Sequence, residues 1–481
     1  MTGTVRFTDA DVAAFADASH DHNPLHVDPA FARSTPFGRT VVHGALAGIT
    51  ALHRLGADIR GTRLLFQEPV FTDEPYTVVH DGRRVFLRGR GQVVLKAVPR
   101  TGTLSRPPAA ASITPLHDPT IRTRPREHAE ITPGMELTGR YEPRWDGLAA
   151  LTGGPTTPAH LALAFGSYAS GMVLPGRDGV LAEIDLRLYA PPSPHRPLGY
   201  RLRVENHDPR SRITTCSAVL TAEETPVAEL RLCSFAGRRV ERPTLDRVAR
   251  FLPPGSGLTG RTVLVVGCSR GFGAALTLAL LSQGAVVHGT YASSRPAAGA
   301  AGPHADRLRL HQADATDPAA MAKVLESITG NLTGVVLNAT PPLRPIALSS
   351  EAAADARHHA DQAIAAAMVP LSCALPKLNR TGHWALFVST EAVTAPPAHW
   401  PHYITAKAAI EGLASWLAHN HAEVDTAVLR LPPMRTELTN TPTGHLNARA
   451  PEELAAAVVR RLLRQDWPST PWSFPAEATI R

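Results

Sequence analysis

The chain of 481 residues is 43% hydrophobic and carries a formal net charge of +7. That length is too great for one core, so two to four domains are expected, and the composition excludes a disordered protein. Basic residues are spread along the chain and only 5% of residues are aromatic, which argues against nucleic-acid binding. A mild positive charge suits a phosphate-bearing cofactor or an acidic carrier protein.

The four cysteines lie far apart and never in a CxxC spacing, so neither a zinc site nor a disulfide framework is expected. The first residues lack a secretion-signal pattern, and no apolar run reaches the ~18 residues of a membrane span. These features predict a cytoplasmic protein with no membrane contact.

Two segments rich in proline, glycine and arginine, residues 105–134 and 237–260, divide the chain. We therefore expect domains at residues 1–110, 130–240 and 258–470. The first two each contain one helix-like stretch and several alternating strand patterns, which indicates a duplicated α+β unit. The third alternates apolar strands with helices, the pattern of an α/β Rossmann-type, doubly wound parallel sheet.

Titratable residues gather at Ser19–Asp28, whose sequence is SHDHNPLHVD. Asp21 and His26 flank an Asn-Pro turn that can aim both side chains into one pocket. Further along, VVHGAL begins a helix whose first N–H groups, at His43 and Gly44, have no intrahelical acceptor. Removing water from a 3-hydroxyacyl thioester needs a base for the α-proton, an acid for the hydroxyl and donors for an enolate-like oxygen. The segment predicts that chemistry.

Two other interpretations fit the residue types alone. The loop could simply cap a helix, with Asp21 in an Asx turn. His20, His22, His26 and Asp28 could instead bind a metal, but their spacing fits no familiar template, so no metal is expected.

The stretch from Phe15 to Ile49 closely resembles the MaoC-like, (R)-specific enoyl-thioester hydratase family of hot-dog folds. It contains the D-x-N-P-x-H signature, Phe37 and the His-Gly pair at the helix start. The resemblance implies that Asp21 and His26 are the catalytic pair and that the N–H of Gly44 is an oxyanion donor. Residues 130–240 lack the signature but resemble a non-catalytic hot-dog partner, which would give a double hot-dog with one active site. An unrelated β domain is the alternative.

A glycine-rich turn opens the third part. Gly267, Gly271 and Gly273 follow an apolar strand and enter a helix, which lets the main chain approach a pyrophosphate. Further on, Tyr403 and Lys407 form a YxxxK pair on one helical face. A neighbouring ammonium favours the phenolate and eases proton transfer to or from a carbonyl oxygen. Either motif alone is weak, since such turns and surface Tyr–Lys pairs are common.

Together these motifs resemble the short-chain dehydrogenase/reductase family, which implies a nicotinamide cofactor. By that resemblance the cofactor-binding residues are Gly267, Ser269, Arg270, Gly271, Phe272, Gly273, Ser293, Asp314, Asn338, Tyr403, Lys407 and Thr436. The catalytic hydroxyl belongs to Ser389 or Thr390; counting forward from Gly382 favours Ser389, which we prefer, and counting back from Tyr403 favours Thr390.

The third part also departs from the family. Ala366 stands where the family has a catalytic Asn, which is thought to hold a proton-relay water. That change puts turnover, though not cofactor binding, in question. Between Gly284 and Ala305 there is no Asp or Glu to meet the ribose 2′-hydroxyl of NAD, so NADPH is the expected cofactor.

The two parts could share an intermediate. We therefore expect a bifunctional NADPH-dependent 3-oxoacyl-thioester reductase and (R)-3-hydroxyacyl-thioester dehydratase. It would give trans-2-enoyl thioesters, on acyl carrier protein or CoA, in polyketide or fatty-acid-like biosynthesis, and would form a homodimer or higher homo-oligomer. The alternatives are an enoyl hydratase with an NAD-dependent 3-hydroxyacyl dehydrogenase of β-oxidation, or a dehydratase with an inactive cofactor-binding scaffold.

Overall fold

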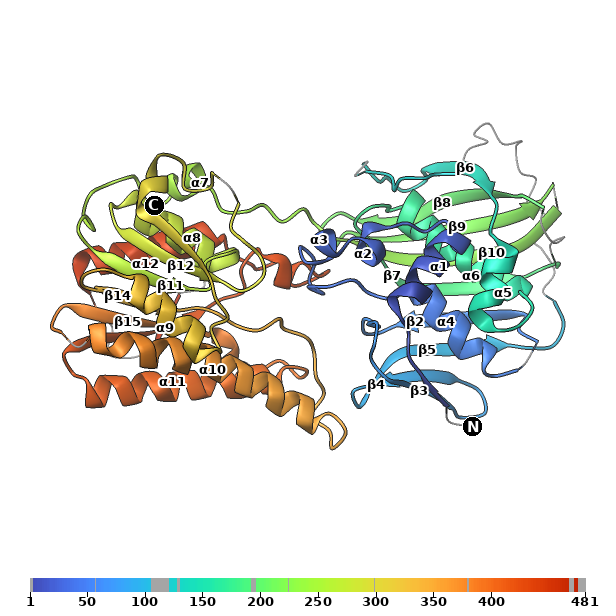
Figure 1. Cartoon of the computed structure of the whole chain (residues 1–481). Coiled ribbons are helices and arrows are strands. Elements are labelled where there is room, and N and C mark those ends of the chain that lie inside the picture. Colours follow the sequence, from blue (N-terminus) through green and yellow to red (C-terminus); the bar gives the residue numbers. More distant parts are fainter. Residues whose placement is uncertain are drawn as a thin grey trace. The chain divides into compact units, whose positions relative to one another are not determined.

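The chain forms two compact units in a computed structural model (Figure 1). The structure describes residues 3–56, 58–104, 121–127, 130–191, 196–223, 225–297, 299–378, 380–466 and 471–474. Unit 1 comprises Met1–Arg239 and Asn440–Leu446, and unit 2 comprises Val240–Thr439 and Asn447–Arg481. Most of the first expected linker, residues 105–120 and 128–129, lies outside the described residues.

Unit 1 is built on one antiparallel sheet. Its strands are β1 (Gly3–Val5), β2 (Gly61–Phe66), β3 (Tyr76–His80), β4 (Val85–Gly89), β5 (Gln92–Arg100), β6 (Glu136–Tyr141), β7 (Gly179–Leu188), β8 (Leu198–Asp208), β9 (Ile213–Ala222) and β10 (Thr225–Ala236). Its helices are α1 (Asp9–Ser19), α2 (Pro24–Val27), α3 (Pro29–Ala32), α4 (Gly44–His53), α5 (Trp145–Thr152), α6 (Pro158–Tyr168) and the π-helix η1 (Ala169–Val173).

The strand order of this sheet repeats itself. It runs β1-β3-β4-β5-β2-β7-β10-β9-β8-β6. From the outer edge inward, the first half runs β1-β3-β4-β5-β2 and the second half runs β6-β8-β9-β10-β7. If the strands of each half are numbered from 1 to 5 along the chain, both halves have the order 1-3-4-5-2. The halves join where β2 pairs with β7, with Leu64 opposite Ile184. The two predicted runs of strands therefore form one continuous sheet.

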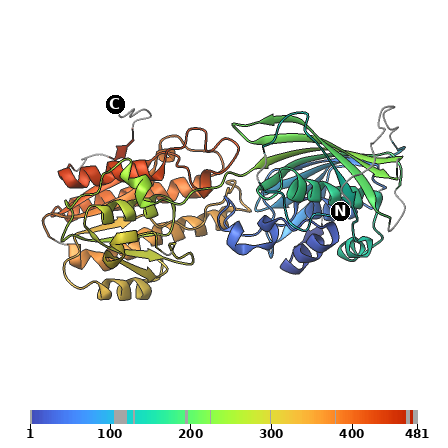
Figure 2. The ribbon, with the colours of Figure 1, turned by 90° about the horizontal axis from the view of Figure 1, so that it is seen from above.

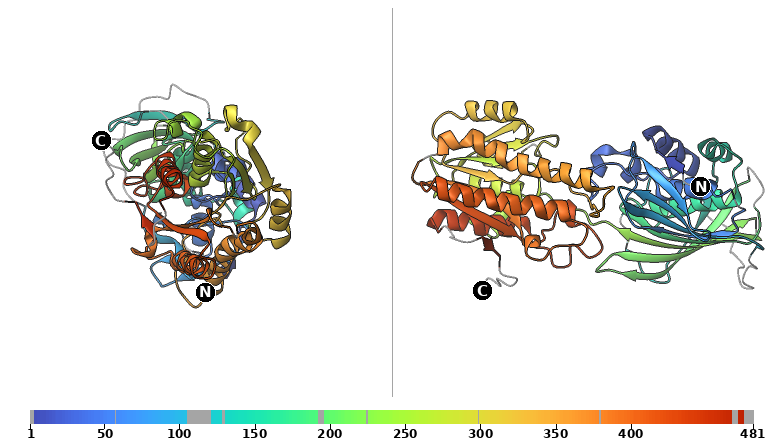
Figure 3. Two further views of the ribbon diagram at one scale, coloured as in Figure 1. Left: turned by 90° about the vertical axis from the view of Figure 1, so that its left-hand side faces the viewer. Right: turned by 90° about the horizontal axis from the view of Figure 1, so that it is seen from below.

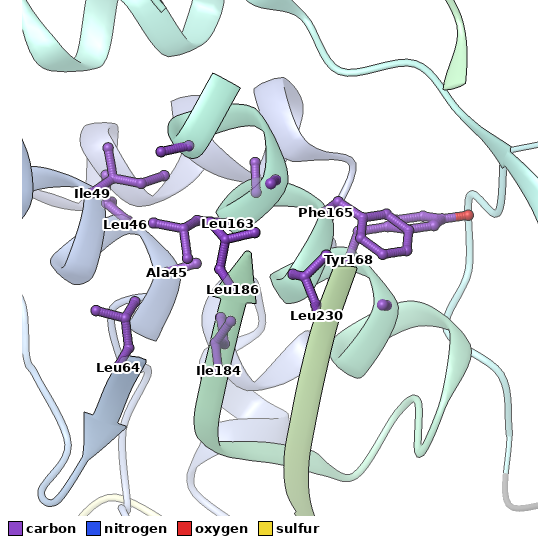
Figure 4. Packing of buried hydrophobic residues seen from close by; sticks show 14 of the residues in the cluster. Ala45, Leu46, Ile49, Leu64, Leu163, Phe165, Tyr168, Ile184, Leu186 and Leu230 are labelled. Carbon is purple, nitrogen blue, oxygen red and sulfur yellow. The ribbon is translucent and has the colours of Figure 1, made fainter. Parts of the chain in front are cut away.

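Each half contributes one buried apolar helix, α4 or α6, to a shared core (Figure 4). Helix α4 carries apolar residues on most of its faces, as expected of a helix that is buried all round. A Cβ atom on Gly48 would lie 2.5 Å from Leu64 Cδ1, so α4 approaches β2 as closely as a glycine allows. On the other side Leu163 and Phe165 of α6 join the same cluster as Leu230. The long strands β8 to β10 curve over α6 (Figure 2).

Unit 2 is an α/β unit. Its strands are β11 (Thr262–Val266), β12 (Val286–Tyr291), β13 (Leu308–Gln312), β14 (Gly334–Leu337), β15 (His383–Thr390), β16 (Val424–Leu431) and β17 (Trp472–Ser473). Its α-helices are α7 (Leu245–Ala249), α8 (Gly271–Ser282), α9 (Pro318–Ser327), α10 (Ala353–Leu378), α11 (Pro401–Asn420) and α12 (Pro451–Arg464), with the 3-10 turns η2 (Gly302–Arg307), η3 (Glu391–Val393) and η4 (Glu437–Thr439).

The strands of unit 2 pair in parallel in the order β13-β12-β11-β14-β15-β16-β17. Helices α8 and α12 pack in the core on one face, and α10 and α11 in the core on the other. The predicted doubly wound parallel sheet is therefore confirmed. Chain order reverses between β11 and β14, the switch point at which such sheets bind ligands. Within the described ranges no helix is long and apolar enough to cross a membrane.

Candidate active sites

The loop between α1 and α2 carries the first site. Helix α1 ends at Ser19, and its C-cap residue His20 has a left-handed main chain with φ 57°, so the chain turns sharply before Asp21. Asn23 caps α2 by accepting a hydrogen bond from the N–H of Leu25. Its side-chain amide also donates to the carbonyl oxygens of Gly171 and Gly176, each at 3.1 Å. Asn23 therefore fixes the turn and ties it to the second half of the sheet.

Asp21 is almost completely buried, with 1% of its surface exposed. Its Oδ2 accepts a hydrogen bond of 2.6 Å from Ser167 Oγ, and its Oδ1 accepts one from the N–H of Asn23 at 3.2 Å. Loss of hydration raises the pKa of Asp21 to about 7, although both hydrogen bonds act in the opposite direction. Near neutral pH this carboxyl group can therefore give or take a proton.

His26 has a defined tautomer. Its Nδ1 is 2.8 Å from the carbonyl oxygen of Val41, which can only accept, so Nδ1 carries the proton and Nε2 has a free lone pair. Burial lowers the pKa of His26 to about 4, so the ring is neutral at pH 7. The bare Nε2 of this neutral imidazole can accept a proton, and the lowered pKa makes it a weaker base than a solvated histidine.

His43 supports both groups. Its Nε2 donates to the main-chain oxygen of Asp21 at 2.9 Å, and its ring stacks on His26 with centroids 3.8 Å apart. Burial and the neighbouring His26 hold the pKa of His43 well below its ordinary value. The sequence indicates this residue only through its N–H group, so the role of its side chain is not predicted.

Gly44 is the first residue of α4, as predicted, and so presents an N–H without an intrahelical partner. A Cβ atom there would lie 2.8 Å from Phe66 Cε1, so the position has room only for glycine.

The second half of the sheet contributes two residues that the sequence did not identify. Ser167 lies at the end of α6, and Gly171 lies in the π-helix that follows. A Cβ atom on Gly171 would lie 2.2 Å from Asp21 Oδ1, so glycine leaves the space that the carboxyl group occupies. The expected non-catalytic partner is therefore more than a passive support, because Ser167 binds the predicted catalytic carboxyl group directly. In the sequence, the one signal of Ser167 is a run of small residues inside an apolar helix.

The metal interpretation is not supported for the residues that the sequence suggested. His20 contacts the carbonyl oxygen of Glu142, His22 lies beside Asp17, and Asp28 caps α3.

A different set comes closer to a metal site. Among the described residues, Asp21, His26 and His43 lie near enough to share an ion, with one ligand atom of each within 4.8 Å of the others. The rings of His26 and His43 each donate one N–H to a carbonyl group, which leaves the other ring nitrogen as an acceptor. That arrangement suits proton transfer as well as it suits metal binding.

In unit 2 the glycine-rich turn has the geometry that a phosphate cradle needs. Gly267 and Gly271 adopt φ angles of +86° and +54°, which favour glycine. A Cβ atom on Gly273 would lie 2.0 Å from the carbonyl oxygen of Gly267, which also accepts a hydrogen bond of 2.8 Å from Asn338. Helix α8 begins at Gly271 without a side-chain cap, so its first N–H groups face the turn. These residues fit a dinucleotide.

Thr436 and Asp314 are two further cofactor candidates. Thr436 lies beside this turn, and Asp314 lies close to the same edge of the sheet. A Cβ atom on Gly271 would meet Thr436 Cγ2 at 3.3 Å, so Thr436 lies beside the cradle. Asp314 follows β13 and accepts hydrogen bonds from the N–H and the hydroxyl group of Thr316, each at 2.9 Å. Asp314 therefore orders the turn at the end of that strand.

The other candidates differ in what they can offer a cofactor. The side chain of Phe272 packs in the hydrophobic core, so only its main chain can face the cradle. Ser269 lies within the glycine-rich turn, and Arg270 is the residue immediately before α8. Ser293 is exposed just after β12.

The second acid–base group lies on α11. Lys407 Nζ is buried, donates to the carbonyl oxygen of Val388 at 2.8 Å and lies 5.8 Å from the centre of the Tyr403 ring. Burial lowers the pKa of Lys407 to about 8. Burial also raises the pKa of Tyr403, against a hydrogen bond with Thr390 that lowers it. The sequence suggests that Lys407 favours the phenolate; instead desolvation dominates and keeps the phenol protonated.

The structure distinguishes the two candidate hydroxyl groups. Ser389 Oγ donates to Glu411 Oε1 at 2.6 Å, and Glu411 is itself paired with Arg430. Thr390 shares a hydrogen bond with Tyr403. This geometry favours Thr390 over Ser389, the residue that we prefer from the sequence, because adjacent residues of a strand point to opposite faces of the sheet.

Comparison with known proteins agrees with both geometries. Residues 2–85 match the family described as MaoC like domain, and residues 261–445 match the family described as short chain dehydrogenase. The chain is 44% identical over 79 residues to an (R)-specific enoyl-CoA hydratase from Aeromonas caviae, covering 15% of this chain and 59% of that protein. It is 40% identical over 70 residues to a mitochondrial 3-hydroxyacyl-(acyl-carrier-protein) dehydratase from Arabidopsis thaliana, covering 14% and 42%. The chain thus spans about half the length of these relatives.

Among solved structures, a short-chain dehydrogenase/reductase from Serratia marcescens is 22% identical, with a TM-score of 0.39, over 45% of this chain and 96% of that one. A 3-ketoacyl-(acyl-carrier-protein) reductase from Brucella melitensis, complexed with NADH, is 19% identical, with a TM-score of 0.39, over 43% and 91%. The two family matches show that the chain joins a MaoC-like domain at its N-terminus to a short-chain dehydrogenase domain at its C-terminus, and both resemblances are confirmed.

Proposed function

We propose that this chain is a bifunctional 3-oxoacyl-thioester reductase and (R)-3-hydroxyacyl-thioester dehydratase. The observation that carries the proposal is the presence, in one chain, of two acid–base groups: Asp21 with His26, and Tyr403 with Lys407. The 3-hydroxyacyl thioester that Tyr403 and Lys407 would form is the substrate that Asp21 and His26 would dehydrate. The same strand order in both halves of unit 1 further supports a duplicated hot-dog with one active site.

Dehydration follows from the protonation states. Nε2 of His26 takes the α-proton, and the electrons of that C–H bond form the new double bond. The C3–O bond breaks as Asp21 protonates the departing hydroxyl group, so water leaves. The N–H of Gly44 stabilises the charge that develops on the thioester oxygen. Transfer of the proton from His26 to Asp21, directly or through solvent, restores the starting state.

Reduction uses the second group. A bound nicotinamide cofactor would supply hydride to the 3-oxo carbon. Thr390 hydrogen-bonds the substrate oxygen, and Tyr403 protonates it. Burial raises the pKa of Tyr403, so its phenol carries the proton that reduction requires at the substrate oxygen.

NADPH is the proposed cofactor. The segment after β12 has no carboxylate for a ribose 2′-hydroxyl, and Arg270 and Ser293 are the proposed 2′-phosphate contacts. The acyl group would be carried by CoA or an acyl carrier protein in a biosynthetic pathway of the polyketide or fatty-acid type. A homo-oligomer in the cytoplasm remains the proposed state.

The proposal is tested by mass spectrometry of acetoacetyl thioesters, on CoA and on a carrier protein, incubated with NADPH or NADH. Oxidation of NADPH with formation of the butenoyl thioester is the expected result. Release of a hydroxyacyl product alone would contradict the dehydratase assignment. Hydration or dehydration of supplied standards without any reduction would contradict the reductase assignment and favour the scaffold alternative.

A further inference from the structure

Unit 1 includes one short segment, Asn440–Leu446, that lies far from the rest of the unit in the sequence. The chain on both sides of this segment belongs to unit 2. The segment is the tip of the loop between β16 and α12, a loop that contains no helix or strand besides the single turn η4 (Figure 3). The base and the tip of one loop therefore belong to different units.

The base of the loop is closed within unit 2. Met434 and Arg449 form an isolated parallel bridge, and the N–H of Arg435 donates to the carbonyl oxygen of Arg449 at 2.9 Å. Thr436, which lies beside the cofactor cradle, is the next residue along the chain. Its N–H donates to Thr439 Oγ1 at 3.3 Å, so the chain that runs on to the tip takes part in positioning Thr436.

The tip of the loop is bound within unit 1 by Asn440, which is only 7% exposed. Asn440 Oδ1 accepts a hydrogen bond from the N–H of Arg238 at 2.8 Å, and Asn440 Nδ2 donates one to the carbonyl oxygen of Arg238 at 2.8 Å. Since an N–H only donates and a carbonyl oxygen only accepts, the amide has a single possible orientation. Its side chain pairs with both main-chain groups of one residue, as a neighbouring antiparallel strand does.

His445 adds a second contact at the tip. Its Nε2 lies 2.9 Å from the carbonyl oxygen of Arg210, in the turn between β8 and β9, and its Nδ1 lies 2.8 Å from the carbonyl oxygen of Thr441. Arg238 donates to the same Arg210 oxygen at 2.6 Å. Asn440 and His445 both contact main-chain groups, so these contacts depend on the folded main chain of unit 1.

We propose that Asn440 is a positioning residue of the reductase, which binds the tip of the loop to unit 1 and thereby holds Thr436 beside the cofactor cradle. This inference rests on the proposed function, because that function brings a nicotinamide cofactor to Thr436. A loop fixed at its base and its tip loses less conformational entropy when it closes on a ligand. The affinity of the reductase for its cofactor would then depend on a hydrogen-bonded pair within unit 1.

The experiment compares Asn440→Asp with the matched control Asn447→Asp, both in the full chain. Each substitution keeps the size of the side chain and adds the same charge to the same loop. At position 440 the new carboxylate oxygen faces the carbonyl oxygen of Arg238, so one hydrogen bond becomes a repulsion. Asn447 is exposed and lies just beyond the tip. Asn440→Ala removes both hydrogen bonds without adding charge and should behave like Asn440→Asp.

The first readout needs no cofactor. Amide hydrogen exchange of residues 436–446 should be faster in Asn440→Asp than in the native chain, and unchanged in Asn447→Asp. The second readout is the Kd for NADPH, or for NADH if the native chain binds it more tightly, measured by calorimetry. Two ordinary hydrogen bonds shift an equilibrium by roughly 10- to 100-fold, and the affinity falls with the fraction of docked loops. We therefore expect the Kd to rise by roughly 3- to 30-fold in Asn440→Asp only. Dehydration should be unchanged in all three variants.

Faster exchange with an unchanged Kd would overturn the inference, because the tip would be released without any effect at Thr436. Equal exchange in Asn440→Asp and Asn447→Asp would overturn it as well, since Asn440 would not hold the loop. A native chain that binds the cofactor but reduces no 3-oxoacyl thioester would contradict the proposed function, while the Kd comparison would still decide the inference. A native chain that binds neither cofactor would overturn both.

Discussion

The two proposed active sites differ in how they are assembled. The proposed dehydratase site draws on both halves of unit 1, since Asp21 and His26 come from the first half and Ser167 and Gly171 from the second. The proposed reductase site uses residues from consecutive strands and helices of one sheet, with Thr390 at the end of β15 and Tyr403 on the next α-helix. A site shared between halves depends on packing between distant segments, whereas the second site depends on local motifs.

The largest expected effects separate the two sites. Asp21→Asn removes the acid and should lower dehydration by about 10²- to 10⁴-fold while reduction persists. Tyr403→Phe should lower reduction by a similar factor while dehydration persists. Steady-state assays with acetoacetyl and (R)-3-hydroxybutanoyl thioesters measure both. Loss of both activities in one folded variant would refute two independent sites.

Gly171→Ala tests whether the second half shapes the dehydratase site. The added methyl group would overlap the Asp21 carboxyl group, so the carboxyl group must move. We expect roughly a 10²-fold loss of dehydration, since a displacement of about 1 Å can cost that much. Reduction serves as the control. Unchanged dehydration would mean that Asp21 does not act from its position in this structure.

The choice between Thr390 and Ser389 gives a matched pair of variants in the proposed reductase. Thr390→Val removes the hydroxyl group beside Tyr403 and should lower reduction by at least about tenfold. Ser389→Ala removes only the contact with Glu411 and should keep most of the rate. The reverse ranking, measured as kcat/KM with one 3-oxoacyl thioester, would restore our original preference for Ser389.

The smallest effect concerns pH. Dehydration needs neutral His26 and protonated Asp21, so its rate should fall below pH about 4 and above pH about 7. The Ser167 hydrogen bond lowers the pKa of Asp21, so Ser167→Ala should raise that pKa and move the alkaline limb to higher pH. An alkaline limb that stays fixed would show that Asp21 does not control it.

Much of this chain could be predicted from its sequence. The glycine-rich turn, the YxxxK pair and the D-x-N-P-x-H signature are local patterns whose spacing fixes their geometry, and each lies where its motif implied. The contribution of Ser167, the stacking of His43 on His26 and the orientation of Ser389 could not be predicted. They depend on which distant helix packs against a loop and on which face of a strand a side chain leaves.

The central claim is that one site makes the substrate of the other. The most direct measurement is chiral analysis of the product that Asp21→Asn forms from an acetoacetyl thioester and NADPH. The account predicts accumulation of the (R)-3-hydroxybutanoyl thioester, which the native chain then converts to the butenoyl thioester. Accumulation of the (S) isomer, or native protein that leaves the (R) isomer unchanged, would contradict it.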